Sequence, residues 1–140
     1  MNTAAITPGK VADGSTQPCV LVVDDDPAIR EICLINLQLE GLRVLEAANG
    51  QIGLARARFE RPDLVLTDVT MPGLDGFELA EALRGHGRTR SIPLVFLSGD
   101  LEAANQTRAA ALGALAYVTK PFDPAALAAL IAKTLANSVI

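Results

Sequence analysis

Acidic residues gather where two apolar runs of the sequence end. Asp24, Asp25 and Asp26 directly follow "VLVV", and Asp68 ends the run "LVLT" in "LVLTDVTMPGLDG". Carboxylates this close repel one another unless a cation lies among them. Mg²⁺ suits such a group because it takes a few carboxylate and carbonyl oxygens and keeps several waters. The pattern therefore predicts a magnesium site, whereas Asp26 alone is better explained as the cap of a helix that begins at Pro27.

Two later apolar runs end in a hydroxyl and an amine. Ser98 ends "PLVFLS", and Lys120 ends "AYVTK". A hydroxyl and an ammonium that face a metal-bound carboxylate would neutralise and hydrogen-bond the oxygens of a phosphoryl group. Either residue alone is more often a solvated loop residue. Their joint appearance with the acids, in order and each at a strand end, favours a phosphoryl site.

The elements that must position these side chains alternate along the chain. Five strand-like apolar runs are separated by segments of helical length: "CVLVVD", "LRVLEAA", "PDLVLTD", "IPLVFLS" and "LAYVTK". Repeated strand–helix units in one domain predict an α/β fold with a doubly wound, five-stranded parallel sheet, flavodoxin-like and in the strand order 2-1-3-4-5. In that order the first and third strands are neighbours about 5 Å apart, so that their terminal acids converge in one pocket.

Two helices have clear start signals, and a third is unusual. Asp-Pro pairs precede amphipathic segments at Pro27 and Pro124, and Gly41 supplies a stop for the first of them. Their expected core positions are Ile29, Ile32, Cys33 and Leu37, and Leu127, Leu130, Ile131 and Leu135. In "LEAANQTRAAAL" large apolar residues stand only at the ends, so little buried area would hold a helix there. We expect this helix to be the most movable.

Composition limits the remaining possibilities. A chain of 140 residues has the length of one domain, and its net charge of −4 argues against direct nucleic-acid binding. Cys19 and Cys33 match no disulfide framework or zinc spacing, and a single histidine excludes zinc centres and catalytic triads. Without an apolar run of membrane-spanning or signal-peptide length, we expect a cytoplasmic protein that does not bind membranes. The expected organisation is a flexible N-terminal tail over 1–18, a domain over 19–137 and a short end over 138–140.

Five separated elements together resemble one known family. The acidic pair Asp24-Asp25, Asp68 in "TDVTMPGLDG", Ser98-Gly99, Tyr117 and "KPF" at Lys120 resemble the receiver domain of two-component response regulators. The resemblance extends from position 19 to about position 137. It implies a phosphorylation-activated signalling switch, which is a phosphoacceptor and not an enzyme in the usual sense, because it catalyses only its own phosphorylation and dephosphorylation.

The resemblance also implies roles at the acidic pocket. Asp68 would be the phosphoacceptor and would take a phosphoryl group from a phosphohistidine of a sensor histidine kinase or a histidine phosphotransfer protein. Asp25, Asp68 and the backbone carbonyl of Thr70 would bind Mg²⁺, and Asp24 would act on it through water. In-line phosphoryl transfer needs this positioning and charge neutralisation more than it needs a protein acid or base.

Further roles concern the response to phosphorylation. Ser98 and Lys120 would contact the phosphoryl oxygens, and Lys120 would be aimed by a cis bond to Pro121. Ser98 and Tyr117 would then switch and remodel the surface of the fourth helix, fifth strand and fifth helix, which an unknown protein target would read. Thr70 and Asp100 occupy positions that influence dephosphorylation in the family. Our hypothesis is that Asp100 orients or repels approaching water or partner groups.

Two alternatives stay open at this point. The first is a pseudo-receiver, an interaction module that kept the fold and lost the phosphoryl chemistry; the complete set of acids, hydroxyl and amine argues against it. The second is a small phosphatase of the haloacid-dehalogenase type, because Asp24 and Asp26 form a D-x-D after the first strand. That family's pattern has Thr where this chain has Ala28, and usually a cap insertion. A stand-alone receiver and a piece of a longer regulator fit the sequence equally well.

Overall fold

The computed structural model describes residues 17–100 and 102–138. Within them five parallel strands form one sheet in the order β2-β1-β3-β4-β5, which confirms the predicted doubly wound topology. The strands are β1 (Cys19–Val23), β2 (Arg43–Ala47), β3 (Leu64–Asp68), β4 (Leu94–Ser98) and β5 (Ala116–Thr119). The helices between and after them are α1 (Pro27–Leu39), α2 (Gly50–Glu60), α3 (Gly76–Arg84), α4 (Ala103–Ala111) and α5 (Pro124–Ser138).

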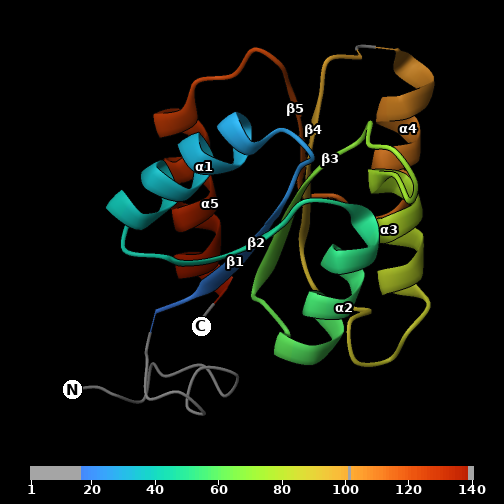
Figure 1. The fold of residues 1–140 in the computed structure, drawn as a ribbon, viewed down its shortest axis with the longest axis horizontal. Coiled ribbons are helices and arrows are strands. Elements are labelled where there is room, and N and C mark those ends of the chain that lie inside the picture. The colour runs from blue at the N-terminus through green and yellow to red at the C-terminus, as the bar shows by residue number, and fades with distance from the viewer. Residues whose placement is uncertain (1–16, 101, 139–140) are drawn as a thin grey trace.

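Helices cover both faces of the sheet, with α1 and α5 on one face and α2, α3 and α4 on the other (Figure 1). Successive side chains of β1 therefore enter different cores. Val20 and Val22 pack with α1 and α5, whereas Leu21 and Val23 pack with the helices of the opposite face. Every residue of the three central strands is buried, which explains why their sequences are nearly continuous apolar runs.

The expected capping signals start two helices. The Asp26 carboxylate accepts a hydrogen bond from the amide of Ala28 at 2.9 Å, and α1 begins at Pro27. Asp123 likewise accepts from the amides of Ala125 and Ala126 at the start of α5. These bonds satisfy amides that have no partner within the helix itself. The capping bond accounts for the acidic residue Asp26. It does not account for Asp24 and Asp25, which belong to the predicted magnesium site.

Two of the expected core positions are wrong. Ile32 is 41% exposed and Leu130 is 45% exposed, although their neighbours Cys33 and Ile131 are buried. With 3.6 residues per turn, adjacent residues point about 100° apart around a helix. The core faces of α1 and α5 are centred on the buried neighbours, and this rotates Ile32 and Leu130 to the rim. Both then line grooves beside the connection between β5 and α5.

Helix α4 buries little of its surface, as expected. Ala109 is its buried residue, and the N-cap residue Glu102 makes no side-chain capping bond. Arg108 instead ties α4 to α3 through an ion pair with Glu81 at 2.8 Å and a position over the ring of Phe77, 4.6 Å from its centroid. Exposed contacts of this kind contribute little stability compared with a buried apolar face. The packing is consistent with a movable helix.

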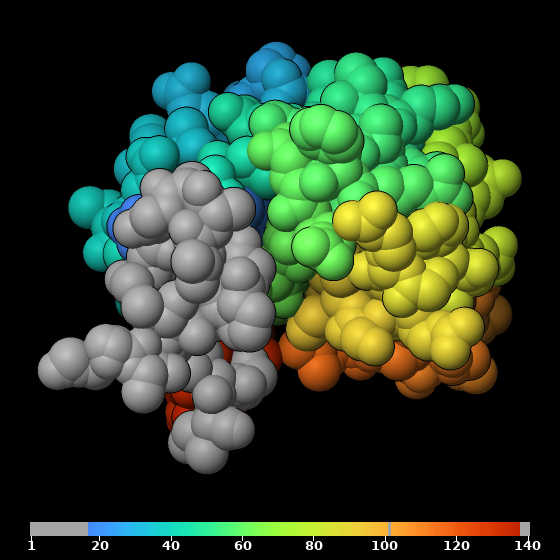
Figure 2. Space-filling model, turned by 90° about the horizontal axis from the view of Figure 1, so that it is seen from below, coloured from blue at the N-terminus to red at the C-terminus, as the bar shows by residue number. Residues whose placement is uncertain are grey.

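The two ends of the sheet differ in character. Viewed from below, the end of α2 and the loop between α3 and β4 lie side by side (Figure 2), and the carboxyl ends of the strands lie at the opposite end of the sheet (Figure 1). The predicted N-terminal tail lies outside the described residues except for Gln17 and Pro18, which hydrogen-bond Gly41 and Arg43. Among the described helices, none combines the length and hydropathy of a bilayer-crossing segment.

Candidate functional site

Three carboxylates converge at the carboxyl ends of β1 and β3. These strands pair in parallel, so Asp24 and Asp25, which follow β1, come close to Asp68 at the end of β3. One oxygen of each carboxylate lies within 4.8 Å of the others. Asp24 and Asp68 are buried and Asp25 is exposed. A group of hard oxygen ligands with one side open to solvent fits Mg²⁺, which keeps several of its waters.

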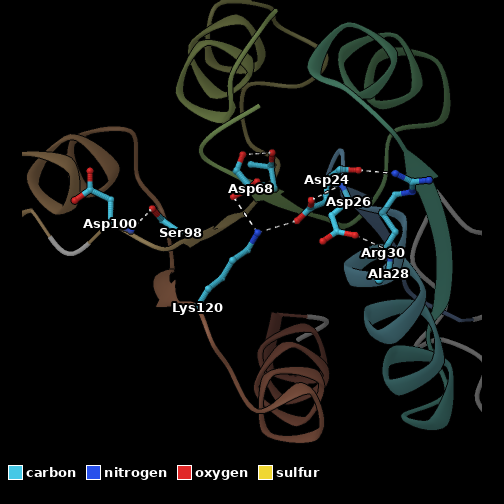
Figure 3. A network of polar contacts seen from close by, with 9 residues as sticks. Asp24, Asp26, Ala28, Arg30, Asp68, Ser98, Asp100 and Lys120 are labelled. Carbon is cyan, nitrogen blue, oxygen red and sulfur yellow. Dashed lines mark hydrogen bonds and ion pairs between the residues drawn. The ribbon is translucent and has the colours of Figure 1, made fainter. Parts of the chain in front are cut away.

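Lys120 connects two of these carboxylates. Its Nζ lies 3.3 Å from an oxygen of Asp24 and 3.3 Å from an oxygen of Asp68 (Figure 3). Lys120 follows β5, and its bond to Pro121 is cis, as the resemblance implied. The ammonium thus reaches the acids across the width of β3 and β4. It stands where it would meet the oxygens of a group attached to Asp68.

The charges in the site perturb one another. Burial raises the pKa of the Asp68 carboxyl, as does the charge of Asp24, while Lys120 and a hydrogen bond from the amide of Thr70 oppose the change. Burial acts to lower the pKa of Lys120, but the charges of Asp24 and Asp68 outweigh it, so that this pKa is raised. Lys120 is therefore positively charged at neutral pH, and excess negative charge remains for a divalent cation to neutralise.

Asp24 is held through each of its polar groups. Its amide donates to the carbonyl of Ala47 at 3.1 Å, and one carboxylate oxygen accepts from the amide of Asp26 at 2.9 Å. The other carboxylate oxygen pairs with Lys120, and the backbone carbonyl accepts from Arg30 at 2.7 Å. Sequence analysis did not single out Arg30. The available signal was that it is the one basic residue in α1.

Ser98 and Tyr117 meet at the backbone of Asp100, beside the acidic cluster. The Ser98 hydroxyl accepts from the amide of Asp100 at 3.0 Å, and the Tyr117 hydroxyl donates to the carbonyl of Asp100 at 2.5 Å. In Figure 3 the Asp100 carboxylate points away from Lys120. Its two oxygens accept from the amide of Glu102 and the side chain of Asn105, each at 2.8 Å. Asp100 therefore contacts the start of α4, which the sequence did not indicate.

Comparison with known proteins agrees with this geometry. The family model of the response regulator receiver domain matches residues 20–132. Protein PilH of Pseudomonas aeruginosa is 37% identical over 118 residues, which are 84% of this chain and 98% of that protein. The DNA-binding dual master transcriptional regulator RpaA of Synechocystis is 39% identical over 106 residues, 76% of this chain and 44% of that protein. The chain spans about half the length of the curated transcriptional regulators that it matches.

Solved structures show the same fold. The chemotaxis protein CheY4 of Vibrio cholerae superposes with a TM-score of 0.76 at 34% identity, covering 89% of this chain and 99% of that one. The receiver domain of the Francisella response regulator 1452 gives a TM-score of 0.80 at 27% identity, covering 89% of this chain and 100% of that one. With the family model matching most of its length, the chain belongs to the family of response regulator receiver domains of two-component systems.

Proposed function

We propose that Asp68 accepts a phosphoryl group from a phosphohistidine in a Mg²⁺-dependent reaction. Receiver domains as a family are phosphoacceptors that histidine kinases phosphorylate. The observation that carries the proposal for this chain is the convergence of Asp24, Asp25, Asp68 and Lys120 at neighbouring strand ends. The donor would be a sensor histidine kinase or a histidine phosphotransfer protein.

In the proposed step a carboxylate oxygen of Asp68 attacks phosphorus. The phosphorus–nitrogen bond to the donor imidazole breaks, the nitrogen keeps the electron pair and takes a proton, and an aspartyl phosphate forms. Water later hydrolyses this mixed anhydride. Mg²⁺, held by Asp25, Asp68 and the Thr70 carbonyl, with Asp24 acting through water, would supply charge neutralisation of the phosphoryl oxygens. The ammonium of Lys120 would neutralise a further oxygen after leaving Asp68.

An apolar groove beside Lys120 supports the proposed donor. It has a volume of about 410 Å³ and is lined by Ile29, Ile32, Lys120, Pro121, Phe122 and Pro124. A protein that presents a histidine to Asp68 must lie next to Lys120, so this groove is where its apolar contacts would form. The exposure of Ile32, at 41%, is explained if a partner covers it during transfer.

The contacts of Asp100 support a route from phosphorylation to the surface. Movement of the Ser98 hydroxyl toward a phosphoryl group would break its bond with the Asp100 amide. The Asp100 carbonyl accepts a hydrogen bond from Tyr117, and its carboxylate accepts from the start of α4. Loss of the bond to Ser98 would therefore shift both Tyr117 and the start of α4. The remodelled surface of α4, β5 and α5 would bind a protein target. With a net charge of −4, we propose no direct contact of this chain with nucleic acid.

Intact mass after incubation with acetyl phosphate tests the proposal. Wild type in Mg²⁺ should gain the mass of one phosphoryl group, whereas wild type in EDTA and Asp68→Asn in Mg²⁺ should gain none. No gain under any condition would favour the pseudo-receiver alternative. Turnover of a generic phosphomonoester that is lost in Asp24→Ala would favour the phosphatase alternative instead.

A further inference from the structure

Arg30 contacts the acidic loop through the main chain. The guanidinium Nη1 donates to the backbone carbonyl of Asp24 at 2.7 Å, and Figure 3 shows Arg30 extending from α1 toward this turn. The opposite side of the guanidinium faces β2, where its Nε lies 3.4 Å from a carboxylate oxygen of Glu46. The Arg30 side chain is 19% exposed and that of Glu46 is 42% exposed. Arg30 is thus largely enclosed between the acidic loop and the edge strand.

The carbonyl that accepts the hydrogen bond from Arg30 belongs to the peptide unit that sets the orientation of Asp25. A peptide unit is planar, so the carbonyl of Asp24 and the amide of Asp25 rotate as one body. The amide of Asp24 is already fixed by its bond to Ala47 on β2. Arg30 fixes the carbonyl of Asp24. It thereby fixes the plane of the peptide bond that joins Asp24 to Asp25. Asp25 is exposed and would otherwise have little to hold its carboxylate beside the two buried ones.

We propose that Arg30 is a positioning residue for the Mg²⁺ site, and that Glu46 orients its guanidinium. The inference rests on the proposed function, because it concerns the metal that the three carboxylates would bind. Arg30 itself touches neither the metal nor the phosphoryl group. It acts by keeping the carboxylate of Asp25 in reach of those of Asp24 and Asp68.

The sign of the effect separates positioning from simple charge. Arg30 is a cation beside a cation site, so deleting its charge alone would strengthen Mg²⁺ binding. Loss of a residue that orients a metal ligand weakens metal binding, by about 10- to 100-fold for comparable supporting residues. The two explanations therefore predict opposite changes in the dissociation constant of Mg²⁺.

The test is calorimetric titration of Mg²⁺ into wild type, Arg30→Ala, Arg30→Lys and Arg108→Ala. Arg30→Ala should bind Mg²⁺ at least about tenfold more weakly, and Arg30→Lys, which keeps the charge and one donor, should recover part of the loss. Arg108→Ala is the matched control. Arg108 pairs with Glu81 at 2.8 Å and links α4 to α3 on the opposite face of the sheet from α1, so its loss should leave Mg²⁺ affinity within about twofold of wild type.

Thermal unfolding in EDTA shows whether each variant is folded. Should Arg30→Ala fail to fold, Arg30→Met keeps a long unbranched side chain and removes both the donor and the charge, so it should also weaken Mg²⁺ binding, whereas loss of charge alone would strengthen it. Mg²⁺ affinity of folded Arg30→Ala equal to or above that of wild type would overturn the positioning role. Absence of Mg²⁺ binding by wild type would overturn the proposed metal site itself, which keeps the two failures distinct.

Discussion

Substitution of Gly76 by alanine should slow phosphorylation of Asp68. Gly76 is the first residue of α3, and its amide donates to the carbonyl of Val69 at 2.9 Å. A Cβ added to Gly76 would lie 2.2 Å from the backbone oxygen of Asp68 and 2.9 Å from the Cα of Val69. Real Cβ atoms essentially never approach another atom so closely, so either the helix or the end of β3 must move.

The size of the movement follows from the contact distance. The added Cβ and the backbone oxygen of Asp68 must separate by 1.2 Å to lengthen their contact from 2.2 Å to an ordinary 3.4 Å. Helix α3 resists displacement because Asp75 and Glu78 form a reciprocal capping box and Phe77 is buried. The strand end that carries Asp68 therefore shares the movement. A misplacement of about 1 Å costs up to ~100-fold in rate, and overpacking costs about 1–3 kcal/mol in the free energy of unfolding.

The assay is the rate of phosphorylation by acetyl phosphate at saturating Mg²⁺, with urea unfolding measured in parallel. Two controls separate position from stability. Gly50→Ala places a Cβ 2.3 Å from the oxygen of Leu74, a comparable clash later in the connection between β3 and α3 and not with Asp68 itself, and should lose stability but less rate. Gly99→Ala has no atom within 4 Å of the new Cβ and should change neither. A folded Gly76→Ala with the wild-type rate would refute the reasoning, as would an equal rate loss in Gly50→Ala.

Three further predictions concern the site and its response. Lys120→Ala should still bind Mg²⁺ but uncouple phosphorylation from the surface change, because the ion pairs at 3.3 Å that link β5 to the acids are lost; phosphorylation-dependent amide shifts in α4 that match wild type would show that this role is wrong. Since burial and a neighbouring charge raise the pKa of Asp68 above 3.8, folding favours its protonated form, and the stability of wild type falls as pH rises through the folded pKa. Asp68→Asn should therefore be more stable than wild type to urea in EDTA at neutral pH, with the difference shrinking as pH falls toward 3.8; a difference that does not change with pH would contradict this. Asp100→Ala should alter the lifetime of the aspartyl phosphate and speed amide exchange at the start of α4, because the bonds from Glu102 and Asn105 are lost; an unchanged lifetime would make the hypothesis about Asp100 wrong.

The parts of the fold that could be predicted depend on local patterns. Nearly continuous apolar runs predicted buried parallel strands because both faces of β1, β3 and β4 are covered. The convergence of Asp24 with Asp68 followed from strand order, which the alternation of strands and helices strongly restricts. Chemistry-bearing residues at strand ends then identified the region of the site without knowledge of side-chain directions.

The parts that could not be predicted depend on the direction of single side chains or on main-chain atoms. The bond from Arg30 to the carbonyl of Asp24 has no signature beyond the residue's place on α1. The turn of the Asp100 carboxylate toward α4 depends on the path of the connection after β4. The exposure of Ile32 depends on how α1 is rotated about its axis, and a pattern that includes both Ile32 and Cys33 does not determine this.

The position of the phosphoryl group tests the central claim most directly. The protein would be phosphorylated with acetyl phosphate in Mg²⁺ and reduced with borohydride, which converts an aspartyl phosphate to homoserine, and its peptides would then be sequenced by mass spectrometry. Homoserine at position 68, and at no other aspartate, is the predicted result. Homoserine in place of Asp24, which is the first acid of the D-x-D, or in place of Asp25 would contradict the assignment of Asp68 as the phosphoacceptor.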